Sequence, residues 1–290
     1  MIRKKRKKAD AILTADWHIW DKQPLCRTDD FWVAQVKKMN EVSKLQKEHG
    51  CPVFHSGDLT EGWKISPFLL DTLYKHLPNQ FHTVLGNHDL KNHSLESLPQ
   101  TGINVLESVG KIKILSGLHW EQKDEYEYHL IPIKERLLLI SHEMVWQGEK
   151  PWFDCADPNI SKMFSKYPKA DIILTGHNHT TFTDYYNGKV AINPGSLTRH
   201  KADQVNHKPC IFLYYADTNT IKAHYLKIEE NVISRDHIEI INEKEDRVDA
   251  FLETLNAEYK VKASYEKNVE RLMQINNIDI ETKNKIRECM

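Results

Sequence analysis

The 290-residue sequence lacks the cysteine spacing and the long apolar runs that mark disulfide-rich, zinc-ribbon or membrane proteins. No apolar stretch reaches the roughly 18 residues that a membrane span needs. The cysteines are odd in number and none is spaced as Cys-x-x-Cys, which predicts reduced thiols in a cytoplasmic protein rather than disulfides or a sulfur-ligated zinc. They are Cys26, Cys51, Cys155, Cys210 and Cys289.

The sequence also has no excess of charge of either sign: its formal net charge is −1. Nucleic-acid binding, if present, must therefore come from local patches. The obvious patch is the basic run from Arg3 to Lys8, which makes residues 1–9 either a phosphate-binding arm or a solvated tail. No apolar signal core follows this run, which argues against secretion, so we expect a cytoplasmic location.

The remaining composition is that of an ordinary globular protein, with 40% hydrophobic and 28% charged residues. This length allows one large domain and a small appendage. Beyond residue 230 the sequence becomes rich in Glu, Lys and Asn and its patterning becomes helical. We therefore predict a catalytic domain over residues 10–230 and a helical extension over residues 231–290. The extension either packs on the core or serves in dimerisation or partner docking.

Five short polar motifs follow one another along the chain, and each comes directly after an apolar run typical of a buried strand. The motifs are Asp16-Trp17-His18, Gly57-Asp58, Gly86-Asn87-His88-Asp89, His142 and Gly176-His177-Asn178-His179. Open α/β sheets bind ligands at the carboxyl ends of their strands. We therefore expect the motifs to meet at one edge of a sheet.

The segments between the motifs predict helices and hairpins. Helix-start signals stand at Thr28-Asp29-Asp30, at Ser66-Pro67 and at Asp157-Pro158, and Gly50 is a stop signal for the first helix. Asn187-Gly188 between two β-type runs is typical of a type I′ hairpin turn. The sequence therefore predicts an α/β sandwich, in which two sheets or one folded sheet are flanked by helices.

The motif side chains are of the kinds that bind two divalent metal ions. Anionic phosphate esters repel nucleophiles, and two cations about 3.5–4 Å apart offset that charge and stabilise the attacking and leaving oxygens. Such a site needs a bridging carboxylate, for which Asp58 is the candidate. The ligands assigned to one ion are Asp16, His18 and His179, and those assigned to the other are Asn87, His142 and His177. This donor set suits Mn²⁺, Fe or Zn²⁺ better than Mg²⁺, which prefers carboxylates and water.

Two further residues of the third motif are assigned to catalysis. Adjacent residues rarely both bind a metal, so we assign His88 to the substrate, where it contacts a phosphate oxygen or donates a proton to the leaving oxygen. Asp89 is expected to orient that imidazole.

Tryptophans stand within a few residues of several motifs. They are Trp17, Trp20, Trp63 and Trp146. Either they stack on bases of a single nucleic-acid strand, at about 1–3 kcal/mol per base, or they wall the loops and pack the sheet edge. We take Trp17, Trp20 and Trp63 as candidate substrate contacts.

At these residues the sequence resembles the calcineurin-like metallophosphoesterase superfamily, whose pattern is D-x-H, GD, GNH[DE], H and GHxH. The match runs from about Ala11 to Ser196 and includes Asn193-Pro194-Gly195-Ser196 after the last ligand motif. The resemblance implies the metallophosphoesterase-type α/β sandwich and two bound metal ions, in agreement with the ligands assigned above.

Within that superfamily the sequence is similar to the SbcD/Mre11 branch of DNA repair nucleases, particularly to small phage-type relatives. The similarity rests on Asp16-Trp17-His18, on Asp89 where protein phosphatases usually have Glu, and on the stretch from Pro194 to Arg199. Arg199 is a candidate substrate contact. The chain departs from the pattern at Trp20, where glycine is usual, and it has little sequence after the core for a separate DNA-binding cap.

Three functions remain in competition. The first is a Mn²⁺-dependent DNA nuclease, exo- or endonucleolytic. The second is a phosphatase or cyclic-nucleotide phosphodiesterase acting on a small molecule or a phosphoprotein. The third, a non-catalytic binding protein, conflicts with the complete ligand set. The resemblance implies DNA and a Rad50/SbcC-type ATPase as partners, since the chain has no Gly-x-x-x-x-Gly-Lys-[Ser/Thr] loop of its own. A homodimer is the alternative assembly, and no membrane partner is expected.

Overall fold

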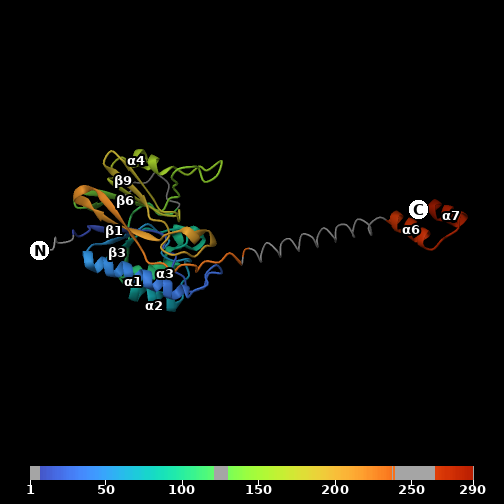
Figure 1. The fold of residues 1–290 in the computed structure, drawn as a ribbon, viewed down its shortest axis with the longest axis horizontal. Helices are drawn as coiled ribbons and strands as arrows, with labels where there is room; N and C mark the ends of the chain where they lie inside the picture. The colour runs from blue at the N-terminus through green and yellow to red at the C-terminus, as the bar shows by residue number, and fades with distance from the viewer. Residues whose placement is uncertain (1–6, 121–129, 237, 239–264, 290) are drawn as a thin grey trace. The chain divides into compact units, whose positions relative to one another are not determined.

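The computed structural model describes residues 7–120, 130–236, 238 and 265–289 (Figure 1). The chain divides into two compact units, Met1–Ser234 and Arg235–Met290. The first unit contains all five motifs.

A six-stranded sheet carries the first three motifs. Its order is β11-β10-β1-β2-β3-β4. The strands are β1 (Ala11–Thr14), β2 (Val53–His55), β3 (Phe81–Thr83), β4 (Ile112–Ile114), β10 (Cys210–Tyr215) and β11 (Thr220–Tyr225). Strands β1 to β4 pair in parallel, so their carboxyl ends lie at the same edge, whereas β10 and β11 continue the sheet in antiparallel pairs.

A five-stranded sheet carries the last two motifs. Its order is β5-β6-β7-β9-β8. The strands are β5 (Ile131–Ile133), β6 (Arg136–Ser141), β7 (Ile172–Thr175), β8 (Phe182–Tyr186) and β9 (Lys189–Asn193). The central β6, β7 and β9 are parallel, and the outer β5 and β8 pair antiparallel to their neighbours.

Alternation of side chains along the strands separates the interior into layers. Ile12 of β1 points into a cluster under the helices, whereas Leu13 points into a second cluster between the two sheets. Leu139 of β6 belongs to a third cluster on the outer face of the five-stranded sheet. This period of two is what a strand buried on both faces requires.

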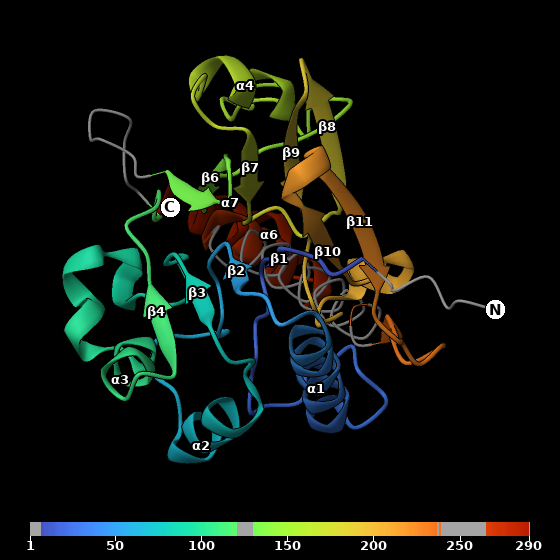
Figure 2. The same cartoon turned by 90° about the vertical axis from the view of Figure 1, so that its left-hand side faces the viewer.

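Helices cover the two outer faces of the sheets. Figure 2 shows α1 (Phe31–His49), α2 (Pro67–His76) and α3 (Gly102–Ser108) on one side and α4 (Met163–Lys166) on the other. Short 3-10 helices occupy the connections: η1 (Lys91–His93), η2 (Leu95–Gln100), η3 (Ile160–Lys162), η4 (Ala202–Asn206) and η5 (Ala216–Thr218). The predicted α/β sandwich of two sheets flanked by helices is confirmed.

Most of the predicted boundaries are confirmed by their capping bonds. The Asp30 side chain accepts a hydrogen bond from the Val33 amide at the start of α1, and Gly50 ends that helix in the left-handed conformation. Ser66 caps α2 in the same way. The third start signal is displaced, because Asn159 rather than Asp157 caps η3, which leads into α4.

The second unit contains helices α6 (Tyr265–Ile275) and α7 (Ile280–Glu288). Asp279 caps α7 by accepting a hydrogen bond from the Thr282 amide. Residues 239–264 of the predicted helical extension lie outside the described residues, as do residues 1–6 of the basic arm. Among the described helices, none combines the length and the apolar character that crossing a bilayer requires.

Candidate metal centre

The five motifs stand in the loops that leave β1, β2, β3, β6 and β7. The first three strands belong to one sheet and the last two to the other. The motifs were expected at one edge of a sheet, and the structure instead gathers them where the carboxyl ends of two sheets meet. Parallel pairing within each sheet makes this convergence possible.

Asp58 lies at the middle of the gathered side chains. Its Oδ2 is 3.5 Å from Nε2 of His18 and 3.3 Å from Nε2 of His142, while its Oδ1 accepts a hydrogen bond from the His88 amide. Burial alone would raise the pKa of this carboxyl, but His142 and His18 hold it below its usual range. A carboxylate between two imidazoles from different sheets has the placement expected of a bridging ligand.

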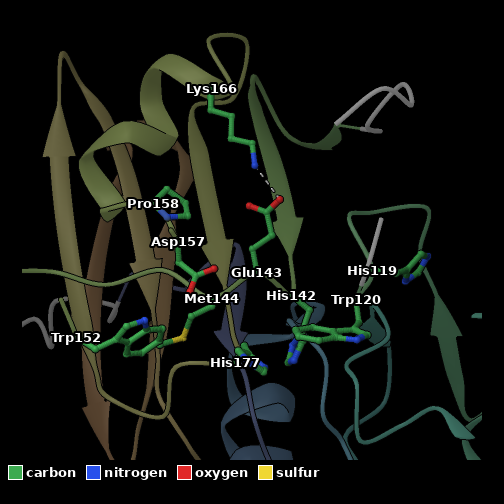
Figure 3. A pocket seen from close by; sticks show the side chains of 10 residues that line it. All are labelled: His119, Trp120, His142, Glu143, Met144, Trp152, Asp157, Pro158, Lys166 and His177. Carbon is green, nitrogen blue, oxygen red and sulfur yellow. Dashed lines mark hydrogen bonds and ion pairs between the residues drawn. The ribbon is translucent and has the colours of Figure 1, made fainter. Parts of the chain in front are cut away.

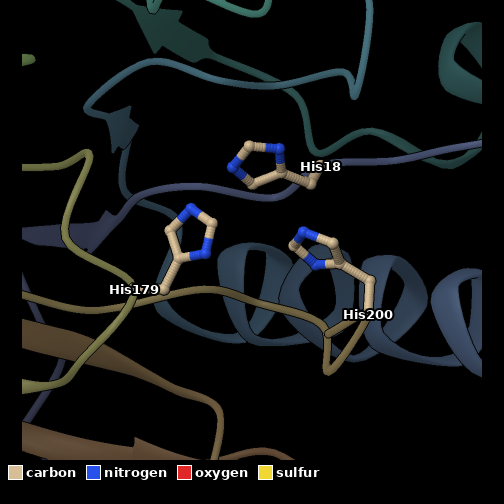
Figure 4. Close-up of side chains that lie close together, drawn as sticks. All are labelled: His18, His179 and His200. Carbon is tan, nitrogen blue, oxygen red and sulfur yellow. The ribbon is translucent and has the colours of Figure 1, made fainter. Parts of the chain in front are cut away.

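One half of the centre contains the ligands predicted for the first ion. The Asp16 Oδ1 atom lies 3.9 Å from His18 Nε2, and the rings of His18 and His179 are 4.7 Å apart. A residue that the sequence did not suggest joins them: the ring of His200 lies 4.9 Å from that of His18 (Figure 4). Potential ligand atoms of His18, His179 and His200 all lie within 4.8 Å of one another.

The other half contains the ligands predicted for the second ion. The Asn87 Oδ1 atom is 3.0 Å from His177 Nδ1 and 3.3 Å from His142 Nε2. Nδ1 of His142 donates a hydrogen bond of 2.6 Å to the Ser56 carbonyl. In the neutral ring this bond leaves the lone pair on Nε2, which faces Asp58 and Asn87.

The backbone is unusual at four predicted ligands. Asp16, His18, Asp58 and His177 have φ values of 48°, 46°, 56° and 69°. Non-glycine residues are uncommon in this left-handed region, which costs about 1–3 kcal/mol at each position and occurs preferentially at functional sites. The surrounding structure must therefore hold these residues in place.

Asp89 helps to fix the backbone of the ligand loops. Its buried carboxylate accepts hydrogen bonds from the amides of Gly86, Asp58, Leu59 and Thr60, at 2.9–3.2 Å. None of its hydrogen bonds within the described residues goes to the His88 ring, so the prediction that Asp89 orients this imidazole is wrong. Asp89 instead ties the loop after β3 to the loop after β2.

Motif glycines permit close approach of the loops, and two of them do so between the two sheets. A Cβ atom on Gly57 would lie 2.5 Å from Nδ1 of His142, and one on Gly176 would lie 2.5 Å from the Ser56 carbonyl oxygen. Real Cβ contacts are longer than this, so both positions require glycine. The loops from the two sheets can then pack backbone against side chain.

The chemistry of the donors fits bound cations. Asp16 Oδ2, His18 Nε2 and His200 Nε2 are buried and have no hydrogen-bond partner among the described residues, a costly arrangement unless something else binds them. Burial raises the pKa of Asp16 to about 7 and lowers that of His177 to about 4. Burial also lowers the pKa of His179. His177 and His179 are therefore neutral at pH 7, which is the form that binds metals. At the other two imidazoles nearby carboxylates outweigh burial: Asp58 raises the pKa of His142 to about 9, and Glu61 raises that of His18.

His88 faces an open part of the centre. It lines a pocket of about 570 Å³ together with Asp58, His177 and His179. The His88 side chain is 32% exposed, and its Nδ1 donates a hydrogen bond to the main-chain carbonyl of Glu61. The location is compatible with the predicted contact to substrate.

Two predicted substrate contacts are wrong. Trp17 is fully buried, packs edge-on against Phe81, and donates its indole N–H to Thr14. The Arg199 side chain is also buried and donates to the carbonyls of Val205 and Glu229. Neither side chain lines the pockets beside the metal centre, because each makes its contacts elsewhere in the protein.

The other tryptophans near the motifs keep part of their surface exposed. Lys22 lies over the ring of Trp20, and Lys91 lies over the ring of Trp63. Neither ring is among the residues that line the His88 pocket. Trp146 donates its indole N–H to the Asp157 carbonyl.

Two tryptophans that the sequence did not suggest stand beside the second half of the centre. Trp120 and Trp152 line a pocket of about 730 Å³ together with His142 and His177 (Figure 3). The rings of Trp120 and His177 are 4.7 Å apart. Neither tryptophan adjoins a motif in the sequence, so no sequence signal could have placed them here.

Comparisons with known proteins were made for the whole chain. A search of curated proteins gave no match. Among solved structures, the chain is similar to an archaeal phosphodiesterase (14% identity, 74% of this chain and 99% of that chain, TM-score 0.44). It is also similar to a Vps29 single mutant from Entamoeba histolytica (15% identity, 76% and 99%, TM-score 0.37). A third similar structure is a metallophosphoesterase from Sphaerobacter thermophilus (13% identity, 76% and 89%, TM-score 0.39).

The family model described as the calcineurin-like phosphoesterase superfamily domain matches residues 12–217, which is most of the chain. The matched span contains every predicted metal ligand, and also the three clusters of histidine and aspartate able to hold an ion that occur among the described residues. This family implies two divalent metal ions and metal-dependent hydrolysis of phosphoesters. The chain belongs to the calcineurin-like phosphoesterase superfamily.

Proposed function

We propose that the protein is a two-metal phosphodiesterase that cleaves DNA, a Mn²⁺-dependent nuclease of the SbcD/Mre11 type. The observation that carries the hydrolytic part is the position of Asp58, which lies within 3.5 Å of imidazoles from both sheets. The observation that favours a nucleotide substrate is the tryptophan-lined pocket beside His142 and His177.

Bound at this centre, two divalent ions would supply charge neutralisation and Lewis-acid activation of the phosphate. The chain's own residues supply the rest. Asp89 holds the loops in register, and Asp58 spans the two halves of the centre. His88, exposed in the adjoining pocket, is placed to donate a proton to the leaving oxygen.

The tryptophan pocket suits a base next to the scissile phosphate. Every base has a π-face, so stacking on Trp120 and Trp152 would hold single-stranded DNA with little sequence preference, at about 1–3 kcal/mol per base. Trp152 is 49% exposed and can therefore meet a ligand. Lys201 lines the His88 pocket and adds a cation near the path of the phosphates.

DNA and the other partners stay predictions. The helical extension of residues 231–290 would dock a Rad50/SbcC-type ATPase or a second copy of the chain, and residues 1–9 would contact phosphates. Lys7, at the end of that arm, lies 3.6 Å from Asp217 and over the ring of Tyr215. If residues 1–9 contact DNA phosphates, deleting them should lower the salt dependence of DNA affinity.

The test is incubation of the full chain with Mn²⁺ and a panel of labelled single- and double-stranded DNA, alongside bis-p-nitrophenyl phosphate. Cleavage of DNA and of the small diester, both abolished by Asp58→Asn, supports the proposal. Hydrolysis of the small diester without any cleavage of DNA would assign the site to a small phosphodiester. A chain that binds Mn²⁺ and hydrolyses neither contradicts the hydrolase itself.

A further inference from the structure

The carboxylate of Glu61 faces three imidazoles of the candidate metal centre, although Glu61 itself belongs to no ligand motif. Its Oε2 lies 2.6 Å from His18 Nδ1 and 3.7 Å from His200 Nε2. Its Oε1 lies 3.8 Å from His88 Nδ1, and the main-chain carbonyl of Glu61 accepts a 3.0 Å hydrogen bond from that same His88 nitrogen. One residue therefore contacts both a metal ligand and the histidine that faces the substrate.

The chemistry of the acceptors fixes the tautomers of both rings. An ionised carboxylate and a carbonyl oxygen can only accept hydrogen bonds, so Nδ1 must carry the hydrogen in His18 and in His88. In each neutral ring the lone pair is then on Nε2. For His18 this atom is buried, has no hydrogen-bond partner among the described residues, and lies 3.5 Å from Asp58. The Nε2 lone pair of His18 is therefore directed at the position of an ion.

The backbone holds Glu61 at this place. The Ile19 amide donates to the Leu59 carbonyl at 3.0 Å, and the Glu61 amide donates to the Ile19 carbonyl at 3.2 Å. These bonds form a short parallel bridge between the segment after His18 and the segment after Asp58. Main-chain pairing thus sets the approach of the Glu61 segment to His18.

We propose that Glu61 is a positioning residue: its carboxylate fixes the ring and tautomer of His18 for metal binding, and its main-chain carbonyl does the same for His88. Outer partners of metal-binding histidines contribute about 10–100-fold to metal affinity or activity. The inference rests on the metal-dependent hydrolase proposed above, but it does not require DNA to be the substrate.

Two variants of similar length separate the hydrogen bond from the charge. Glu61→Met removes the acceptor, whereas Glu61→Gln keeps an acceptor oxygen and removes the charge. In calorimetric titration of the metal-free full chain with Mn²⁺, Glu61→Met should weaken one of the two sites about 10–100-fold. Glu61→Gln should retain most of that affinity. Both variants keep the main-chain carbonyl to His88, so turnover at saturating Mn²⁺ should change much less than affinity.

A matched control exists elsewhere in the chain. Glu41 Oε1 lies 3.0 Å from His224 Nε2, so Glu41→Met removes the same type of contact away from the centre. This variant should leave both Mn²⁺ affinities unchanged. A second readout is the long-range ¹H–¹⁵N spectrum of the histidine rings, recorded at a pH at which the His18 ring is neutral, because the hydrogen bond to Glu61 outweighs burial and raises the pKa of His18. In the metal-free protein His18 should show hydrogen on Nδ1, and Glu61→Met should lose that preference.

Different outcomes contradict the positioning role of Glu61 and the proposed hydrolase. Wild-type affinity together with an unchanged His18 tautomer in Glu61→Met would overturn the positioning role. Equal losses in Glu61→Met and Glu61→Gln would also overturn it, because charge and not orientation would then be the cause. A wild-type chain that binds no Mn²⁺ contradicts the proposed hydrolase, and the tautomer spectrum, which needs no metal, still decides the role of Glu61.

Discussion

The two halves of the candidate metal centre are held in different ways. On the side of His142, the ring is oriented by the main-chain carbonyl of Ser56. On the side of His18, the ring is oriented by a side chain, the carboxylate of Glu61. The His18 half also contains a third imidazole, from His200, whereas the His142 half contains the amide of Asn87 and opens toward the tryptophan pocket.

This difference bears on which half can change by mutation. No substitution deletes a main-chain carbonyl, so the orientation of His142 survives most sequence changes. The His18 half depends on two side chains outside the motifs, and its donor set contains more imidazole. Imidazole suits Zn²⁺ and Fe, whereas oxygen donors suit Mn²⁺. We therefore expect metal affinity and preference to be adjusted mainly in the His18 half.

The largest effect is expected where the halves meet. Asp58→Asn removes the charge shared by both, so Mn²⁺ affinity should fall at both sites by more than the about 10–100-fold typical of an outer partner. Diester hydrolysis should be lost. Metal analysis after dialysis and a bis-p-nitrophenyl phosphate assay measure both effects, and loss of a single ion would show that Asp58 does not bridge.

His88→Ala tests whether the substrate side is separate from both halves. The variant should keep two ions and slow turnover about 10²–10⁴-fold, the range for loss of a general acid or base. Loss of either ion would instead make His88 a ligand, which its place in the Asp58–His18–His88 cluster allows geometrically. Equilibrium dialysis with Mn²⁺ and steady-state kinetics together distinguish the two roles.

Trp152→Ala tests whether the tryptophan pocket beside His142 binds DNA. DNA affinity should weaken about 5–150-fold, which corresponds to about 1–3 kcal/mol of lost stacking, while hydrolysis of bis-p-nitrophenyl phosphate stays unchanged. Tyr225 of β11, which is similarly exposed, provides the control as Tyr225→Ala. Fluorescence anisotropy with labelled single strands measures the change, and equal effects in both variants would remove the pocket from DNA binding.

His200→Ala tests the additional imidazole of the His18 half. Affinity should fall about 10-fold or more at one site and stay unchanged at the other, because His200 lies near His18 and His179 but is absent from the Asp58–His142–His177 cluster. A two-site calorimetric titration resolves the halves. Unchanged affinity at both sites would mean that the orphaned His200 nitrogen serves no ion.

The smallest effect concerns Lys38 of α1, which is buried beside Arg199. Burial lowers the pKa of Lys38, beside Arg199, from 10.5 to about 8. The folded state therefore releases this proton more readily than the unfolded state, and stability should rise with pH between about 8 and 10.5. Lys38→Met should flatten this rise. It should also raise the free energy of unfolding at pH 7 by about 1 kcal/mol, because the gain from removing a buried charge exceeds the loss of the hydrogen bond to the Lys227 carbonyl. Denaturant unfolding at several pH values measures it, and an unchanged slope would contradict the shift.

The metal ligands could be predicted from the sequence because they depend on local motifs. Each predicted ligand follows a strand, so parallel pairing brings the ligands together within each sheet. The meeting of the two sheets depends on packing between distant segments and was not predicted. Glu61, His200 and Trp120 could not be ranked from sequence, because their contacts come from loop packing between segments far apart in the chain. Trp17 was misjudged because adjacency to a motif does not say which way a ring points, and here the ring turns into the core. Asp89 was misjudged because backbone amides of two loops compete for its carboxylate.

The close packing at Gly57 and Gly176 has a consequence for engineering this protein. In a library that varies these glycines, most variants would have steric clashes, because even one added methyl group would lie too close to His142 or to the Ser56 carbonyl. The segment that bears Trp152 and the fully exposed Phe153 has no such restriction on its surface side chains. Selection for a new substrate should therefore randomise that segment and leave the glycines untouched, so that catalytic geometry and specificity can be evolved separately.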